Sequence, residues 1–225
     1  MPRAFRTLAI DVGGTALKAS VLDARGKLLA ACVSLPTPYP CSPKILMNAL
    51  VELAKKLPRF DRVSVGFPGV VRNGSVKTAP HFGNDMWTDF NLTGVLQKKW
   101  KKPVRLLNDA DMQGLALVQG RGLELVVTLG TGVGTAFFRD GELMPHLELA
   151  HHAVSDGKTY NEYIGEKARK RIGGKEWNRR VLRVVRILYN LTHYDRIYLG
   201  GGNSRRIKFR LDSKMCVSDN SAGVL

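Results

Sequence analysis

The first third of the chain alternates short apolar runs with glycine and proline turns, a pattern typical of strands joined by tight turns. Three such runs, RTLAID at 6–11, ALKASVLD at 16–23 and KLLAACVSL at 27–35, predict three short strands, because glycine-containing turns separate them. Ser42 followed by proline is a typical helix start, and the apolar spacing after it predicts a helix over residues 43–57. Residues 61–67 then predict a fourth strand, and residues 81–89 an irregular, partly aromatic loop of the kind that often carries function.

The rest of the chain continues this alternation, and the predicted elements are a helix at 91–100, a strand at 104–108, a helix at 109–118, strands at 124–129 and 133–139, helices at 160–172 and 176–191, and a strand at 196–199. Strands that alternate with helices predict an α/β fold. One internal repeat stands out, since IDVGGTALKA and TLGTGVGTAF both read as strand, glycine turn with threonine, and strand. The repeat predicts two similar lobes, residues 1–103 and residues 104–225, with the boundary near Pro103.

Composition narrows the possible partners. The 225 residues are 44% hydrophobic and 24% charged, which excludes disordered and fibrous classes. Lys and Arg number 35 against 19 Asp and Glu, so the net charge of +16 suggests nucleic acid, an anionic membrane surface or a polyanionic substrate as partner. Three cysteines without a C-x-x-C spacing argue against a disulfide framework and a cysteine zinc site. The absence of a signal core and of long apolar runs predicts a soluble, cytoplasmic protein without a membrane partner.

Two glycine loops are candidates for binding phosphate. Glycines let the backbone turn sharply and direct N–H groups and a threonine hydroxyl at an anion. The first loop consists of Asp11, Gly13, Gly14 and Thr15, with Lys18 in the next strand. The second consists of Gly130, Thr131, Gly132 and Gly134. A plain hairpin explains either loop alone, but two such loops predict a cleft that grips phosphates from both sides, with Asp11 able to orient a magnesium ion.

Three further motifs combine polar or glycine residues with the end of a predicted element. Asn108 and Asp109 lie where a strand becomes a helix, so Asp109 is either a helix cap or a base that takes the proton of a sugar hydroxyl. Glu148 and His151 can face one ligand, although a surface Glu beside a His whose hydrogen bonds are made within the protein is the simpler alternative. A catalytic zinc site would need a third ligand, which the neighbouring sequence does not offer. The glycine run at 200–202 is either a turn that lets the backbone approach a ligand closely or a loose loop. It lacks the G-x-G-x-x-G spacing of dinucleotide sites.

Taken together, the motifs resemble a known family. IDVGGTALKA, FPGVV, LLNDADMQGLA, VVTLGTGVGTAFF, LELAHH and IYLGGGNS occur in the order found in the ROK sugar kinases, and within them the chain is most similar to the polyphosphate glucokinases. The resemblance covers residues 7–204. It implies two actin-like (ribonuclease H-like) lobes around a central cleft, Mg²⁺ as cofactor, and transfer of a phosphoryl group from polyphosphate, ATP or both to the 6-hydroxyl of glucose or mannose. It also implies a homodimer.

The resemblance assigns expected roles by position. It makes Asp109 the catalytic base, Asn108 a hexose contact, and Glu148 and His151 the sugar clamp. The two glycine loops would hold phosphates, and the part of the site that faces a nucleotide would be formed by Gly200, Gly201 and Gly202. His81, Asn84 and Asp85 all remain candidates for a further hexose contact.

The chain also departs from the family pattern. Ala150 stands where glycine is usual in the clamp motif, so its backbone angles should be ones that alanine tolerates. The cysteine-rich zinc segment found in many ROK members is absent, as it is in polyphosphate glucokinases. The family would usually continue beyond the final SAGVL into a closing helix, so a truncated C-terminus is expected.

Most of the positive charge lies in one region. Residues 165–210 carry 14 Lys and Arg against three acids, or +11 of the total +16. On the predicted helix, Lys175, Arg179, Arg183 and Arg186 recur on one face, opposite a face formed by Val181, Val184, Val185 and Leu188. The basic face is either a solvated surface or a track for polyphosphate, and the scarcity of acids favours the track.

Three alternatives to a polyphosphate-dependent kinase stay open. One is an ATP-dependent ROK glucokinase. A ROK transcription regulator would need a helix-turn-helix module, and only ten residues precede Asp11. A protein that binds nucleic acid or another polyanion could use the basic helices, but RNA-stacking motifs and zinc fingers are missing.

Overall fold

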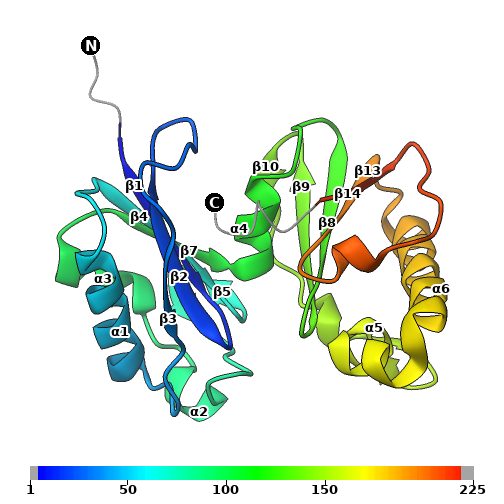
Figure 1. The fold of residues 1–225 in the computed structure, drawn as a ribbon, viewed down its shortest axis with the longest axis horizontal. Coiled ribbons are helices and arrows are strands. Elements are labelled where there is room, and N and C mark those ends of the chain that lie inside the picture. Colours follow the sequence, from blue (N-terminus) through cyan, green and yellow to red (C-terminus); the bar gives the residue numbers. More distant parts are fainter. Residues whose placement is uncertain (1–4, 219–225) are drawn as a thin grey trace. The chain divides into compact units, whose positions relative to one another are not determined.

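The protein divides into two units, one ending at Met112 and the other beginning at Gln113, in a computed structural model that describes residues 5–218 (Figure 1). Each unit is built on a five-stranded sheet with helices packed against it, which confirms the α/β class. The final SAGVL, and with it the expected truncation, lies outside the described residues. None of the helices within residues 5–218 is both long enough and apolar enough to span a membrane.

The sheet of the first unit has the strand order β3-β2-β1-β4-β7. The elements are β1 (Thr7–Val12), β2 (Ala16–Leu22), β3 (Val33–Pro36), α1 (Pro43–Lys55), β4 (Arg62–Phe67), β5 (Val71–Arg72), β6 (Ser75–Val76), α2 (Asn84–Trp87), α3 (Leu92–Trp100), β7 (Val104–Asn108) and α4 (Asp109–Leu115). β1, β2 and β3 form an antiparallel meander, while β4 and β7 run parallel to β1.

Local sequence explains why α1 forms where it does. The Ser42 side chain accepts a hydrogen bond from the backbone N–H of Ile45, and proline occupies the first turn, where it loses no helical hydrogen bond. Leu46, Leu50 and Leu53 recur on one face and are fully buried against the sheet. This face packs on β2 and β3, so the helix covers the antiparallel part of the sheet.

The parallel strands bring three loops to one edge of this sheet. Asp11 of β1 is level with Gly66 of β4, and Phe67 is level with Asn108 at the end of β7. The first glycine loop, the FPGVV segment and the start of α4 therefore all follow the carboxyl ends of adjacent strands, which is where ligands bind in open α/β sheets.

The second unit repeats this arrangement, with the strand order β10-β9-β8-β13-β14. Its elements are β8 (Leu123–Leu129), β9 (Val133–Arg139), β10 (Glu142–Leu143), η1 (Leu149–His151), β11 (Ala153–Ser155), β12 (Lys158–Thr159), α5 (Tyr160–Ile164), α6 (Glu166–Thr192), β13 (Arg196–Gly200), η2 (Ser204–Arg206) and β14 (Met215–Val217). β8, β9 and β10 form an antiparallel meander, and β13 and β14 run parallel to β8. The two sheets thus share one topology, as the internal repeat predicts.

Several boundaries differ from the sequence prediction, among them the ends of α1 at Lys55 and of α4 at Leu115, which come two and three residues earlier than expected. The units divide after Met112 rather than at Pro103, because β7 pairs with β4 and so belongs to the first sheet. The third strand begins at Val33 rather than near residue 27, and the Ser20 hydroxyl donates to the carbonyl of Ala30 in the segment that stays outside the ladder. Two helices were expected at 160–172 and 176–191. The first helix, α5, already ends at Ile164, and the second, α6, begins at Glu166 and is kinked at Gly173, whose φ is 79°.

Candidate active site

The first glycine loop is held by two hydroxyl groups from the segment after β3. Thr37 donates through Oγ1 to the carbonyl of Gly13 at 2.6 Å, and the Tyr39 hydroxyl donates to the carbonyl of Gly14. In a planar peptide the C=O and the following N–H point in opposite directions. The N–H groups of Gly14 and Thr15 therefore face away from these hydroxyls, which is the orientation that an anion-binding turn needs.

Asp11 lies at the end of β1, opposite Lys18 across the β1–β2 pair. Burial raises the pKa of its carboxyl from 3.8 to about 6, and the nearby charge of Lys18 offsets part of this increase. No group of three or more potential metal ligands occurs within residues 5–218. A single carboxylate still suits Mg²⁺, because this ion is usually held by one or two carboxylates together with substrate phosphates.

The three candidates in the loop before α3 have different surroundings. The His81 ring stands beside the first glycine loop, since a Cβ on Gly14 would be 3.6 Å from it. The Asn84 side chain instead accepts from the backbone N–H of Ala79 at 2.7 Å. Asp85 is exposed on α2. Of these three, His81 is the one whose ring contacts the position of Gly14 in the first glycine loop.

Asn108 and Asp109 join β7 to α4 in the same unit. Asn108 is 5% exposed, and its amide donates to the carbonyl of Gly69 at 3.1 Å and accepts from the N–H of Ala110 at 2.8 Å. Asp109 is partly exposed, and its Oδ1 accepts from the N–H of Ala110 at 2.9 Å. The rigid Asn108 amide thus fixes the start of α4, and with it the position of the Asp109 carboxylate.

Gly66 lets α4 approach β4 closely. A Cβ at this position would lie 2.6 Å from the Met112 side chain and 3.5 Å from the Cα of Asp109. The absence of a side chain at Gly66 thus leaves room for the end of the Met112 side chain beneath the helix that begins with Asp109.

The second glycine loop is braced on both sides by asparagine side chains. Asn161 accepts from the N–H of Val133 at 2.7 Å. Asn203 donates from its backbone to the carbonyl of Leu129 at 2.8 Å and from its side chain to the carbonyl of Gly130 at 3.3 Å. Sequence patterns could not identify Asn161, although Asn203 directly follows the glycine run at 200–202.

The glycine run at 200–202 packs against this second loop rather than forming a loose turn. Gly201 has a φ of 81°, and a Cβ there would lie 2.6 Å from the backbone N and O of Leu129. Both the angle and the contact require glycine. Because β8 and β13 are adjacent and parallel, the second loop and the glycine run meet at one edge of the second sheet.

Glu148 pairs with a histidine that the sequence did not single out. His146 is 7% exposed, and its Nε2 lies 3.4 Å from Oε2 of Glu148. This hydrogen bond is the main cause that lowers the pKa of Glu148, with a smaller contribution from His151. His151 itself is exposed at the end of η1. The only signal for His146 was its place two residues before Glu148.

Ala150 fits the clamp motif without strain. It is buried in the 3₁₀ turn of η1 and is absent from the described residues with positive φ. The backbone angles at this position are therefore ones that alanine tolerates, as the sequence predicts.

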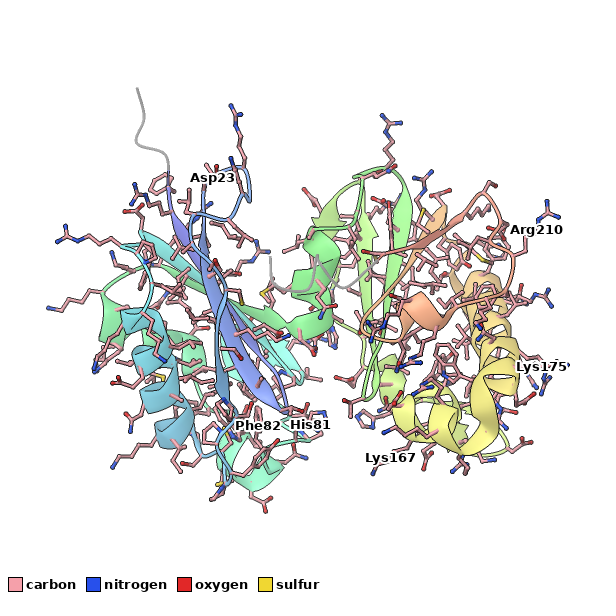
Figure 2. All side chains as sticks on the ribbon, viewed as in Figure 1. Asp23, His81, Phe82, Lys167, Lys175 and Arg210 are labelled. Carbon is pink, nitrogen blue, oxygen red and sulfur yellow. The ribbon has the colours of Figure 1, made fainter. Side chains whose placement is uncertain are left out.

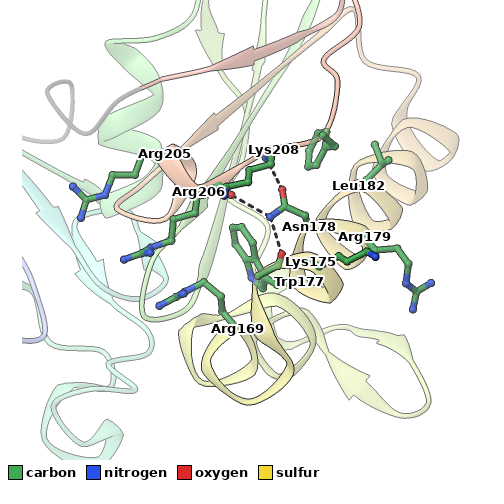
Figure 3. A pocket seen from close by; sticks show the side chains of 11 residues that line it. Arg169, Lys175, Trp177, Asn178, Arg179, Leu182, Arg205, Arg206 and Lys208 are labelled. Carbon is green, nitrogen blue, oxygen red and sulfur yellow. Dashed lines mark hydrogen bonds between the residues drawn. The ribbon is translucent and has the colours of Figure 1, made fainter.

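The second unit also contains a pocket of about 680 Å³ between α6 and the segment around η2 (Figure 3). We call it the basic pocket, because it is lined by six cations: Arg169, Lys175, Arg179, Arg205, Arg206 and Lys208. Lys175 and Arg210 project outward from this unit (Figure 2). Arg183 and Arg186, the other members of the basic face predicted on the helix, are exposed but do not line the basic pocket. The opposite face, formed by Val181, Val184, Val185 and Leu188, is buried as predicted.

Comparison with known proteins shows extensive similarity. The model of the ROK family matches residues 7–148. The polyphosphate glucokinase of Mycobacterium leprae is 31% identical over 89% of this chain, which spans 64% of that protein. The polyphosphate glucokinase of Mycobacterium tuberculosis is 30% identical over 88% of this chain, which spans 77% of it.

Solved structures agree with the sequence relatives. The inorganic polyphosphate/ATP-glucomannokinase of Arthrobacter sp. strain KM superimposes with a TM-score of 0.87 at 30% identity, covering 98% of this chain and 95% of that one. A ROK family glucokinase from Streptomyces griseus, in complex with glucose and AMPPNP, has a TM-score of 0.80 at 19% identity, covering 97% of this chain and 96% of that one, and supports the fold alone.

Proposed function

Because the chain belongs to the ROK family, we propose that it is a hexose kinase that uses inorganic polyphosphate, with ATP as a second donor. The phosphoryl acceptor is the 6-hydroxyl of glucose or mannose. The observation that carries the proposal is the similarity of about 30% to polyphosphate glucokinases over nearly the whole chain. Two braced glycine loops at equivalent edges of the two sheets support it.

Asp109 is the general base in this proposal. It takes the proton of the 6-hydroxyl as that oxygen attacks the terminal phosphorus, the bond to the leaving phosphate breaks, and the leaving phosphate keeps the electron pair. Support comes from its partly exposed carboxylate at the carboxyl end of β7 and from the fixed start of α4. Asn108 supplies that rigidity and, in this proposal, a hexose contact as well.

The phosphate groups engage the two glycine loops. The N–H groups of Gly14 and Thr15 would bind donor oxygens in the first unit, and the loop at 130–134 would do so in the second. Asp11 would hold Mg²⁺ together with donor phosphates. When bound, Mg²⁺ neutralises charge that develops on the transferred phosphoryl group.

Glu148 and His151 form the hexose clamp in this proposal. The hydrogen bond from His146 favours the ionised form of Glu148, so its carboxylate is available to accept from sugar hydroxyls. His151 is exposed and can donate to a neighbouring hydroxyl. We also expect a homodimer in the cytoplasm, which light scattering and cell fractionation would test.

The isosteric substitution Asp109→Asn tests the role of the base. It should lower kcat by about 10² to 10⁴, because it removes the proton acceptor, while the affinity for glucose measured by calorimetry stays close to wild type. Asp23→Asn removes the same charge directly after β2, at the end of that strand away from the first glycine loop, and serves as the matched control. Turnover by Asp109→Asn at the wild-type rate would remove this residue from the role of base.

A coupled assay of the purified protein tests the overall activity. Polyphosphate and ATP are each supplied with glucose and with mannose, and formation of the 6-phosphate is measured. Turnover with ATP alone would instead support an ATP-dependent glucokinase. Absence of turnover with every pair, together with a mobility shift of nucleic acid at physiological salt, would favour a nucleic-acid-binding protein.

A further inference from the structure

The basic pocket collects positive charge from two separate segments of the second unit. Arg169, Lys175 and Arg179 come from α6, whereas Arg205, Arg206 and Lys208 follow β13. Among the residues that the structure describes, none that lines the pocket is an Asp or Glu. Like charges gathered around one hollow repel one another, so the arrangement suits an anionic ligand.

Most of these cations lack an acidic partner. Arg169 is paired with Glu166, and Arg179 with Glu176. The other four cations that line the basic pocket make no ion pair with a carboxylate of the described residues, and they are Lys175, Arg205, Arg206 and Lys208. Their charge is therefore available to a ligand.

The pocket is preorganised by one side chain. Asn178 donates to the carbonyl of Gly174 at 2.9 Å and to that of Arg206 at 3.1 Å, and it accepts from the N–H of Lys208 at 2.7 Å (Figure 3). The bond to Gly174 lies within α6, and the bonds to Arg206 and Lys208 tie the segment after β13 to this helix. The backbone of the cationic segment is thus fixed before any ligand arrives, which lowers the entropy lost on binding.

A chain of contacts leads from the basic pocket to the second glycine loop. Arg169 makes two hydrogen bonds of 2.8 Å with Glu166, whose carboxylate also accepts from Asn203 at 2.9 Å. Asn203 in turn donates to the carbonyl of Gly130. The pocket and the loop therefore share a rigid hydrogen-bonded wall within one unit.

We propose that the basic pocket binds the non-reacting phosphates of a polyphosphate donor whose terminal phosphate reaches the second glycine loop. This inference rests on the proposed function. A volume of about 680 Å³ lies in the usual range for ligand sites. A purine base is uncharged, so it would leave four unpaired cations without a counter-charge, whereas each phosphate of the chain supplies about one negative charge.

The test compares three double variants that each remove two positive charges. Arg205→Gln with Lys208→Gln changes the basic pocket. Arg183→Gln with Arg186→Gln changes the two members of the predicted track that lie outside the basic pocket. Lys98→Gln with Lys99→Gln removes two exposed charges from α3 in the other unit. Binding of a fluorescent long-chain polyphosphate is followed by anisotropy over a salt series, and circular dichroism checks folding.

The pocket pair should weaken binding of the long chain on the order of 10-fold to 100-fold. A plot of the logarithm of the binding constant against the logarithm of the salt concentration should also become less steep, by about two, because two phosphate contacts are lost. Tripolyphosphate, which has few phosphates to place in the pocket, should be affected less than the long chain. Arg205→Lys, which keeps the charge, should recover most of the affinity.

Three results would overturn the proposal. The first is a pocket pair that binds as tightly as the α3 pair, and the second is an outer-face pair that loses more affinity than the pocket pair. The third is a pocket pair that raises the KM for ATP and leaves polyphosphate binding unchanged, which would make the pocket a nucleotide site. Binding does not require turnover, so a wild-type protein that binds polyphosphate in the pocket but phosphorylates no hexose would refute only the proposed function.

Discussion

Asp11→Asn should make the first unit more stable while it removes activity. The carboxyl of Asp11 is ionised at neutral pH although it lies in a buried setting that disfavours its charge. Asparagine has nearly the same shape and carries no charge. The substitution therefore relieves the desolvation cost, and it also removes the ligand that the proposed magnesium ion needs.

The size of the effect follows from the pKa. The pKa of Asp11 rises from 3.8 to about 6, and one pKa unit corresponds to about 1.4 kcal/mol, so ionisation costs the folded state about 3 kcal/mol. This value already includes the favourable charge of Lys18. For a unit of this size, about 3 kcal/mol corresponds to a rise in Tm of roughly 10 °C.

The sign of the pH dependence provides the sharpest check. Because the folded pKa lies above the unfolded pKa, the destabilisation by Asp11 is complete above about pH 6 and disappears as the pH falls to about 4. The gap in free energy of unfolding between Asp11→Asn and wild type should therefore be large at pH 8 and vanish near pH 4. Urea unfolding across this range measures it.

A matched control separates this effect from the general loss of a negative charge. Asp23 accepts hydrogen bonds from the backbone N–H groups of Arg25 and Lys27, and these bonds lower its pKa. Asp23→Asn should therefore not stabilise the protein at neutral pH. Two results would contradict a destabilising charge at Asp11. One is an Asp11→Asn variant with no higher free energy of unfolding than wild type at pH 8, and the other is a difference in free energy of unfolding that is the same at every pH.

Two further predictions concern the second unit. Gly201→Ala should lower the free energy of unfolding by roughly 2–4 kcal/mol, measured through Trp177 fluorescence, since a φ of 81° and a contact of 2.6 Å with Leu129 both exclude a methyl group; an unchanged transition would contradict the close packing. His146→Phe should raise the pKa of Glu148 by removing its main hydrogen bond, so the acidic limb of the profile of kcat/KM for glucose should move to higher pH. The pH-dependent stability that Glu148 provides above its ordinary pKa of 4.5 should shrink in the same variant, and an unmoved limb would exclude Glu148 from sugar binding.

The sequence predicted most of the fold because its signals are local. Ser42 with a following proline marked the start of α1, and the repeat of strand, glycine turn and strand anticipated two sheets of one topology. The unit boundary was less predictable, since nothing local to residues 104–108 shows that this strand pairs with β4. Strand pairing depends on contacts between distant residues, and a single sequence does not display them.

The same distinction applies to the candidate site. The glycine loops and Asp109 have short-range signatures, but the residues that hold them do not. Thr37 contacts Gly13 from 24 positions away, and Asn161 contacts Val133 from 28 positions away. Such bracing residues are ordinary polar side chains in unremarkable segments, so only the folded structure reveals their function.

The charge distribution is unfavourable at two places, and the two have opposite signs. In the first unit a partly buried carboxylate at Asp11 destabilises the fold unless a cation neutralises it. In the second unit, four of the six cations that line the basic pocket have no acidic partner among the described residues, which destabilises the fold unless a polyanion is bound. Natural proteins retain such local costs chiefly where function requires them. A magnesium-bound polyphosphate supplies both missing charges, so one class of donor accounts for the two features that stability alone would remove.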